Sequence, residues 1–300
     1  MMKALAIALF AITCACHSDS GTPAGDDVVD VDAAVTAPGW TPLISRTWSI
    51  PAGATDTYRC KRIQIMQDTW ITGFKSLGPL GTHHTVVTIS DAAPQLGDYD
   101  CQVGSLDLKM LYAAGVNTDD MLFPTGVAMK IKAGQYVNLN LHLFNVSDQT
   151  LADTSGVLIK TVTAAEVVHE ADMTFAGNSN FSVPSDNTPH DVIGGCNAPA
   201  DWHLFGLWPH MHQHATHQKV RLTTGTPMTL LDDAYSFSEQ RNYPMTELAV
   251  AAGTHIEVTC TFVNNTGTPL KFGDSSNEEM CFTGMYKWPA GGNLFQCSTF

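Results

Sequence analysis

The chain has 300 residues, of which 44% are hydrophobic and only 15% are charged. This composition allows a sizeable buried core, and the length is a soft indication of two domains. The formal net charge is −14, and no stretch of the chain concentrates Lys or Arg. That balance argues against nucleic acid as a partner and against docking on an anionic lipid surface.

The first 16 residues are typical of an export signal. Lys3 precedes the apolar run 4–13, which is too short to span a bilayer, and Cys14-Ala15-Cys16 follows. A small residue directly before a cysteine is the pattern that a bacterial lipoprotein signal peptidase cleaves, and Cys16 fits this pattern better than Cys14. We therefore expect an exported protein, either an outer-membrane lipoprotein anchored at Cys16 or an unlipidated periplasmic or extracellular protein. A lipid anchor would be its only contact with a membrane.

Residues 17–39 contain five aspartates and no aromatic residue, Lys or Arg. We interpret this segment as a disordered acidic tether. The body of the chain then contains six cysteines, namely Cys60, Cys101, Cys196, Cys260, Cys281 and Cys297. An even number in an exported chain indicates up to three disulfides, and the spacing alone leaves all fifteen pairings open.

Strand signals follow the tether along the rest of the chain. Alternating or β-branched segments bounded by turn residues lie at 55–66, 83–89, 126–131, 135–146, 156–163, 203–208, 254–264 and 280–288. Only 106–114 and 232–239 show a weak helical pattern. Because βαβ units need helices between strands, we predict an all-β, antiparallel fold. A break near 164–170 divides it into two jelly-roll-like β-sandwich domains in tandem, residues 40–166 and 167–300.

One short segment holds four of the twelve histidines. His210 and His212 are two residues apart, and residues i and i+2 of a strand share a face. Their imidazoles can therefore bind one metal ion, while Met211 points the other way. A polar strand edge with hydrogen-bonded histidines is the competing interpretation. His214 and His217 are either outer partners of the same site or simple neighbours.

A second histidine cluster is formed by His83 and His84. Adjacent residues of a regular strand face opposite ways, so both can bind one metal ion only at a strand end or a β-bulge. His142 lies on the strand face that also carries Asn138 and Asn140. A lone histidine there is either a structural residue or a further ligand. The chain has no GxGxxG, GxxxxGK[ST], HExxH or GxSxG motif.

The order of these motifs resembles the copper type II, ascorbate-dependent monooxygenases, a family that includes peptidylglycine α-hydroxylating monooxygenase and dopamine β-monooxygenase. The similarity covers most of residues 55–290. Its motifs are His83-His84, residues 110–131, NLHLFN around His142, DTSGV at 153–157, His210-x-His212, and 257–267 leading to 272–282. The resemblance implies a monooxygenase with two copper ions per chain, which uses O2 and ascorbate or another one-electron donor.

The resemblance also implies which residues bind each copper ion. The first set, an electron-storing site, consists of His83, His84 and His142. The second set, the catalytic site where O2 is activated to hydroxylate a C–H bond, consists of His210, His212 and Met280. In the family a solvent-filled cleft separates the two ions. A thioether is a soft ligand that suits Cu(I), which agrees with the role of the second set.

The family's disulfides match three pairs of cysteines in this chain. These pairs are Cys60–Cys101, Cys196–Cys297 and Cys260–Cys281. The last pair would hold the strand that follows Met280 against its neighbour. Paired cysteines also leave no free thiolate in the body of the chain to compete for copper.

The residues that would grip a substrate depart from the family pattern. In peptidylglycine enzymes an Arg two residues before the HxH pair binds the peptide carboxylate, and an Asn and a Tyr follow the Met ligand. Trp208, Phe282 and Gly284 occupy these positions here. A C-terminal-glycine substrate is therefore not expected, and Trp208 and Phe282 suggest an apolar or aromatic small molecule. The alternative function is a surface protein that binds and sequesters copper without oxygenase activity, and a third is a zinc-stabilised adhesive sandwich.

Overall fold

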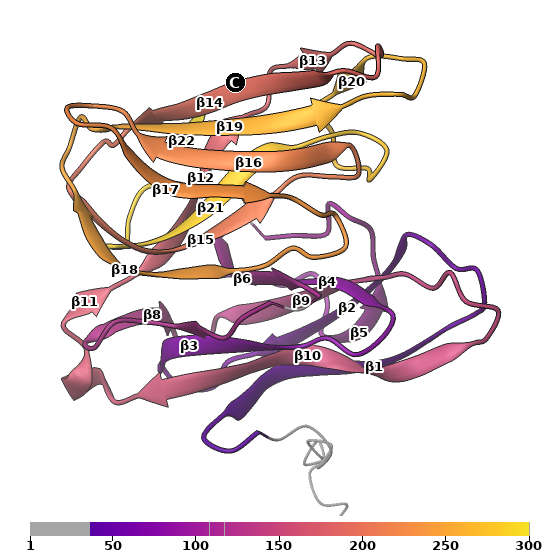
Figure 1. Cartoon of the computed structure of the whole chain (residues 1–300). Helices are drawn as coiled ribbons and strands as arrows, with labels where there is room; N and C mark the ends of the chain where they lie inside the picture. Colours follow the sequence, from indigo (N-terminus) through magenta and orange to yellow (C-terminus); the bar gives the residue numbers. More distant parts are fainter. Residues whose placement is uncertain (1–36, 108, 117, 300) are drawn as a thin grey trace, which may run out of the picture. The chain divides into compact units, whose positions relative to one another are not determined.

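The computed structural model describes residues 37–107, 109–116 and 118–299 (Figure 1). The expected signal segment, its cysteines and nearly all of the expected tether lie outside the described residues. Antiparallel β-sheets make up almost all of the described secondary structure, and the single helical element among these residues is the short 3-10 helix η1, Ala164–Glu166. The predicted all-β fold is therefore confirmed.

The N-terminal half contains two sheets. One has the order β1-β10-β3-β8-β11, with β7 also paired to β3. Its strands are β1 Thr41–Ile50, β3 Thr69–Leu77, β7 Met121–Leu122, β8 Val127–Ile131, β10 Leu151–Val162 and β11 His169–Glu170. The other sheet has the order β5-β2-β9-β4-β6. Its strands are β2 Thr57–Gln64, β4 Thr82–Ser90, β5 Gly97–Asp100, β6 Lys109–Gly115 and β9 Tyr136–Leu143.

The C-terminal half is a second β-sandwich. One sheet has the order β18-β15-β21-β12-β22 and the other β14-β19-β16-β17, and β13 pairs with β20 at one side. The strands are β12 Asp172–Asn178, β13 Ser182–Val183, β14 Pro189–Asn197, β15 Trp202–His210, β16 Ala215–Leu222, β17 Met228–Ala234, β18 Tyr243–Val250, β19 His255–Val263, β20 Leu270–Lys271, β21 Cys281–Trp288 and β22 Cys297–Thr299. The division at residues 166/167 stays a prediction, and β11 just after it pairs in parallel with β8 of the N-terminal half.

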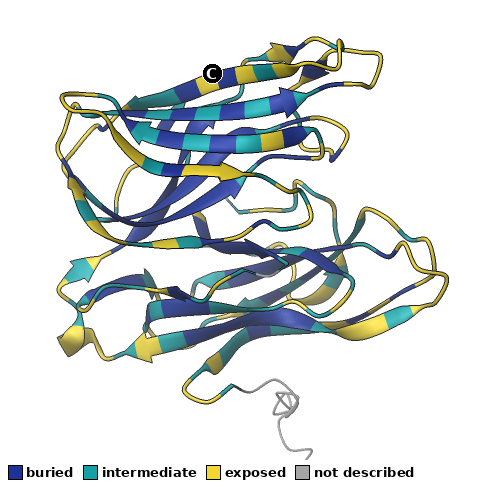
Figure 2. Cartoon of the chain, in the orientation of Figure 1, coloured by how far each residue is buried: buried dark blue, intermediate teal, exposed yellow. Residues whose placement is uncertain are grey.

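Burial along the strands separates outer strands from inner ones (Figure 2). β19 alternates strictly between buried and half-buried residues, because one face packs on the core and the other faces solvent. β9 and β21 are buried along almost their whole length, so both of their faces are covered. The polar residues on the inner strands therefore need partners inside the protein.

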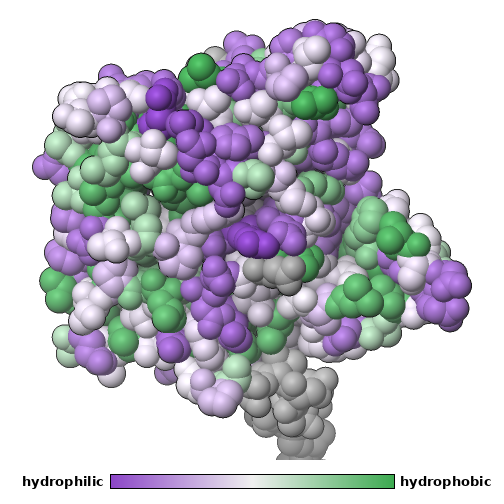
Figure 3. All heavy atoms as spheres, viewed as in Figure 1, coloured by the Kyte–Doolittle hydropathy of each residue, from purple (hydrophilic) through white to green (hydrophobic). Residues whose placement is uncertain are grey.

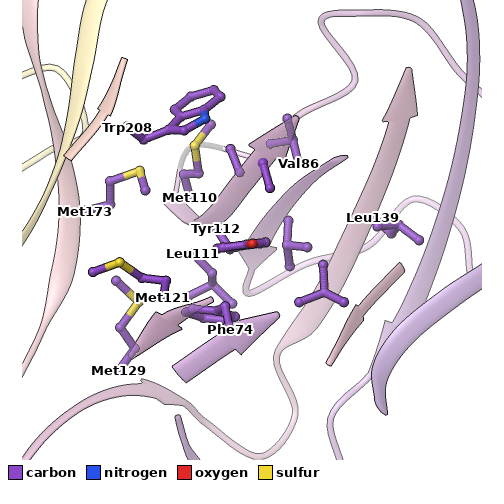
Figure 4. Close-up of a cluster of buried hydrophobic side chains, with 14 of the residues drawn as sticks. Phe74, Val86, Met110, Leu111, Tyr112, Met121, Met129, Leu139, Met173 and Trp208 are labelled. Atoms are coloured by element: carbon purple, nitrogen blue, oxygen red, sulfur yellow. The ribbon is translucent and has the colours of Figure 1, made fainter. Parts of the chain in front are cut away.

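Two hydrophobic cores stabilise the sheets. The second core lies within the C-terminal half, whereas the first continues from the N-terminal sheets into the C-terminal half. Figure 4 shows this continuation, where Met110 and Met121 lie near Met173 and Trp208. The two halves thus bury apolar side chains against each other, which favours their association.

Three disulfides connect the strands, and they are the pairs that the family resemblance implies. Cys60–Cys101 ties β2 to the segment after β5, and Cys196–Cys297 joins β14 to β22. Cys260–Cys281 joins β19 to β21 and so links the two sheets of the C-terminal sandwich.

All eight predicted strand segments contain strands, but the two weak helical predictions are wrong. Residues 106–114 mostly form β6, which is buried on both faces from Met110 onward and therefore has no visible alternation. Residues 232–239 comprise the end of β17 and part of the loop after it.

No helix among the described residues is long and apolar enough to cross a membrane. On the face seen in Figure 3, hydrophilic side chains are interspersed with smaller apolar areas.

Candidate metal centres

The buried polar face of β9 contains one group that lacks a partner. Asn138 accepts a hydrogen bond from Tyr99 at 2.6 Å and donates to the Ser105 carbonyl at 2.9 Å, and Asn140 donates to the Gln102 carbonyl at 3.1 Å. By contrast, Nδ1 of His142 is buried without a hydrogen-bond partner among the described residues. This nitrogen, on an otherwise satisfied face, is therefore available to bind a metal ion.

His83 and His84 lie beside His142 because β4 is irregular at its start. The pairing of β4 with β9 shifts register between Thr82 and His84, and His84 then lies opposite His142. This bulge turns the two neighbouring imidazoles toward one another, with their Nδ1 atoms 3.1 Å apart. The predicted irregular strand entry is confirmed, and the potential ligand atoms of the three histidines all lie within 4.8 Å of one another.

Asp56 sets the tautomer of His142. Its Oδ1 lies 2.9 Å from Nε2 of His142, and the carboxylate also accepts a hydrogen bond from Ser276 at 3.1 Å. A proton held on Nε2 leaves the lone pair on the orphaned Nδ1 atom, which is the form a metal ligand needs. Tyr58 stacks on the same ring, with centroids 4.5 Å apart, and fixes its plane.

The second cluster forms where β15 ends. β15 stops at His210, so His212 lies in the following turn rather than on the strand, yet the two ring centroids are only 5.4 Å apart. Met211 between them points into the core of the C-terminal half, as the alternation predicts. The predicted orientation of Met211 is therefore confirmed, although His212 lies beyond the end of the strand.

The two histidines of the second cluster are oriented by oxygen acceptors. Nδ1 of His210 lies 3.0 Å from Oε1 of Gln240, and Nδ1 of His212 lies 3.0 Å from the carbonyl oxygen of Glu278. Since both acceptors hold a proton on Nδ1, each Nε2 carries a lone pair. The second cluster can thus offer two Nε2 donors, whereas in the first cluster the nitrogens without a hydrogen-bond partner are Nδ1 of His142 and Nε2 of His83.

Glu279 brings Met280 to the second cluster across a long stretch of sequence. Its two carboxylate oxygens accept the backbone N–H groups of His212 at 2.8 Å and His214 at 2.7 Å. This double contact holds the segment before β21 alongside the histidine turn. Met280, the next residue, then lines the same cavity as His210 and His212.

All five clustered imidazoles favour the neutral form. Burial, together with neighbouring imidazoles, lowers the pKa of His83 to about 4 and that of His210 to about 3. The same causes lower the pKa of His84 well below its ordinary value. Burial also lowers the pKa values of His142 and His212, although Asp56 opposes this at His142. Neutral imidazoles at pH 7 are ready to bind a metal ion without first losing a proton.

The two clusters face each other across one cavity of about 160 Å³. The rings of His84 and His210 are 6.4 Å apart between centroids, which is closer than the solvent-filled cleft of the family resemblance implies. Most of the cavity wall is aromatic or aliphatic, and none of its described lining residues is a Lys or Arg. The aromatic part consists of Tyr58, Phe175, Trp208, Phe237, Phe272, Phe282 and Phe295.

Trp208 and Phe282, the two residues that the sequence analysis links to substrate, both lie in this wall. Trp208 stacks on His210 with ring centroids 4.7 Å apart. A single carboxylate, that of Asp274, joins them in the lining. The arrangement can therefore enclose a small apolar group directly beside the second cluster.

His214 and His217 are not among the described residues that line the cavity. His217 pairs with Asp232 at 2.9 Å, and the described contacts of His214 are made by its backbone. Sequence reasoning did not single out Asp56, Gln240 or Glu279, although each orients one or more of the cluster residues. Glu279 could have been suspected from its position next to Met280, whereas Asp56 and Gln240 carry no local signal.

The fold and the donor sets together define a β-sandwich protein in which two clusters of side chains that could bind metal ions share one cavity. Residues 170–299 match the family of the copper type II ascorbate-dependent monooxygenase, C-terminal domain. This match agrees with the sequence resemblance, and the matched family is copper- and ascorbate-dependent. The matched segment includes His210, His212 and Met280 but not the first cluster.

No curated protein matches the chain. Among solved structures, the crystal structure of the STIV MCP is 9% identical, with 75% of this chain and 92% of that chain covered and a TM-score of 0.25. The D431N mutant VP2 protein of infectious bursal disease virus is 8% identical, with 87% and 73% covered and a TM-score of 0.18. Likenesses this weak carry no argument about this chain.

Proposed function

We propose that this protein is a copper-dependent monooxygenase that hydroxylates a C–H bond of a small apolar or aromatic substrate. The observation that carries the proposal is the pairing of a three-histidine cluster with a His2Met cluster across one apolar cavity. His83, His84 and His142 would hold one copper ion, and His210, His212 and Met280 would hold the other. The family of residues 170–299 supports copper and ascorbate as the metal and the reductant.

The donor sets fit copper in both oxidation states. Imidazole binds Cu(II) and Cu(I), and a thioether adds preference for Cu(I) at the second site. When bound, the copper ions supply the one-electron redox chemistry and O2 binding that the side chains cannot provide. The overall reaction balances as R–H + O2 + 2 electrons + 2 protons giving R–OH + H2O, with the electrons taken from two one-electron donor molecules such as ascorbate.

The protein residues contribute orientation and exclusion of water. Asp56, Gln240 and the Glu278 carbonyl hold their histidines with the lone pairs turned away from these oxygens. The aromatic wall beside Met280 keeps the reacting C–H bond out of bulk water. Exclusion of water limits side reactions of an oxidising site.

The size and polarity of the cavity support a small substrate group. A volume of about 160 Å³ is close to that of apolar protein cavities that bind one benzene molecule. The described lining lacks the cation that would pair with a substrate carboxylate. We therefore propose that the group entering the cavity is a single aromatic ring or an alkyl group of similar size.

The decisive experiment combines copper stoichiometry with oxygen uptake in the wild type and in Met280→Ala. We expect two copper ions per wild-type chain and substrate-dependent O2 consumption with ascorbate and a panel of monocyclic aromatic and amine substrates. Met280→Ala should keep the three-histidine copper and lose turnover. Full copper loading without substrate-dependent O2 uptake, with any one-electron donor, would refute the oxygenase and leave copper sequestration as the function.

Two further proposals accompany the function. Export is supported by the three disulfides, which persist in oxidising compartments, and we propose anchoring at Cys16 as a lipoprotein. Cys16→Ser should release the protein from the membrane fraction if this is correct. The zinc-stabilised adhesive alternative would be supported if metal analysis of protein purified without added metal found zinc and no copper.

A further inference from the structure

A loop of the C-terminal half crosses to the N-terminal half at the point where the two clusters meet. We name residues 235–242, between β17 and β18, the strap (Figure 1). The strap starts at the histidine turn, because the Tyr235 hydroxyl donates to the Met211 carbonyl at 2.6 Å and accepts the Met211 N–H at 3.2 Å. Met211 is the residue between His210 and His212, so the strap is anchored to the second cluster.

The middle of the strap touches both clusters. The Phe237 ring lies 4.2 Å from that of His83 in the first cluster and 6.2 Å from that of His212 in the second, measured between centroids. Three residues later, the fully buried Gln240 accepts the hydrogen bond from His210. One short loop therefore packs against histidines of both sites.

The end of the strap is hydrogen-bonded to the N-terminal half. The carbonyl of Gln240 accepts the N–H of Gly115 at 2.7 Å. The backbone N–H of the buried Asn242 donates to Oγ1 of Thr118 at 2.8 Å, and its side chain donates to the Ala113 carbonyl at 2.8 Å. Ala113 and Gly115 are the last part of β6, and Gly115 pairs with His84.

Gly115 permits this close approach. A Cβ atom at Gly115 would lie 2.7 Å from both the Cβ and the backbone nitrogen of Gln240, which is closer than real Cβ contacts. The backbone of Gly115 does not adopt the left-handed conformation that requires glycine. Glycine is therefore needed at this position because the strap packs against its backbone, and not because the chain turns there.

We propose that the strap docks on the end of β6 and thereby holds the two histidine clusters face to face. The spacing between the clusters is then set by the contact of Gln240 with Gly115 and that of Asn242 with Thr118. The strap is a positioning element, since Gln240 also orients His210, and loss of its docking would allow the clusters to separate. The proposal rests on the proposed function only in treating the clusters as copper sites.

The test uses Gly115→Ala, which inserts a methyl group under the strap without changing any candidate ligand. Amide hydrogen exchange is measured on the full-length, metal-free protein. We expect the Asn242 amide to exchange slowly in the wild type and about ten-fold faster or more in Gly115→Ala, while β9 amides stay protected. Gly78→Ala is the matched control, because a Cβ there meets nothing closer than 3.5 Å. Unchanged exchange at Asn242 in Gly115→Ala would overturn the proposal.

A second variant covers the case in which Gly115→Ala fails to fold. Thr118→Val keeps the shape of the side chain but removes the acceptor of the Asn242 N–H, so the same acceleration is expected there. With both sites loaded with Cu(II), electron paramagnetic resonance should detect dipolar coupling in the wild type that Gly115→Ala weakens. Absence of coupling in a doubly loaded wild type would overturn the proposal. Failure to bind copper at all would refute the proposed function, while the exchange measurement would still test the strap.

Discussion

At the scale of single residues, the carboxylate of Asp56 controls whether His142 can act as a ligand. It holds the proton on Nε2, and it does so from a left-handed backbone conformation with φ of 47°. Glycine tolerates this conformation, so Asp56→Gly removes the carboxylate without adding backbone strain. We expect Asp56→Gly to weaken copper binding at the three-histidine site by about 10-fold, within the range for partners of metal-bound histidines.

The measurement is a competition between the protein and a colorimetric Cu(I) chelator. Asp56→Asn is the matched control, since an amide oxygen can still accept from Nε2 and asparagine also tolerates positive φ. It should bind copper nearly as well as the wild type. Asp186→Ala removes the carboxylate of a similar pair with His190, away from the cavity, and should leave copper affinity unchanged. Equal affinities for Asp56→Gly and the wild type would contradict the role of Asp56.

At the scale of elements, the strands could be predicted from the sequence, whereas the contacts between segments far apart in the sequence could not. β9 and β19 follow from β-branched or alternating residues, and the bulge at His83-His84 follows from two adjacent histidines that must share a site. Met280 could be chosen only through the family resemblance, because a methionine before a buried strand resembles any core residue. The contact of Gln240 with His210 joins a loop to a strand end, and no local pattern encodes it.

The disulfide Cys260–Cys281 restrains the position of Met280 through the strand that follows it. It joins β19 to the first residue of β21, directly after Met280. Replacing both cysteines by serine should cost about 3 kcal/mol of unfolding free energy, given the 21-residue separation. It should also weaken the sulfur contribution to X-ray absorption of the Cu(I) protein, because Met280 is less well held.

Cys196–Cys297 provides the comparison. Its sequence separation is 101 residues, so its removal should cost more stability, about 4–5 kcal/mol. It joins β14 to β22, away from Met280, and its loss should leave the sulfur signal of the folded protein intact. If both double variants changed that signal equally, the Met280 environment would depend on overall stability rather than on the adjacent bridge.

At the scale of the whole molecule, bringing five neutral imidazoles into a buried cavity makes the metal-free protein sensitive to acid. Burial lowers the pKa of His83 to about 4 and that of His210 to about 3, whereas an unfolded histidine titrates near its ordinary value of 6.5. Below about pH 6.5 the unfolded chain therefore binds protons that the folded chain does not. The unfolding free energy should fall as the pH decreases from 6.5 toward 4.

His83 alone should account for a loss of about 2 kcal/mol at pH 5 relative to pH 7.5. The buried Glu279 acts in the opposite sense, because burial raises its pKa to about 7, but it is one group against five. Chemical denaturation of the metal-free protein at pH 7.5, 6 and 5 measures the trend. His83→Gln should reduce the pH dependence of the unfolding free energy by the contribution of about one proton. Copper loading should shift the loss of stability to lower pH, since bound metal competes with protons for the same nitrogens. A stability that stays constant between pH 7.5 and 5 would mean that the cavity admits enough water to keep these imidazoles at their ordinary pKa.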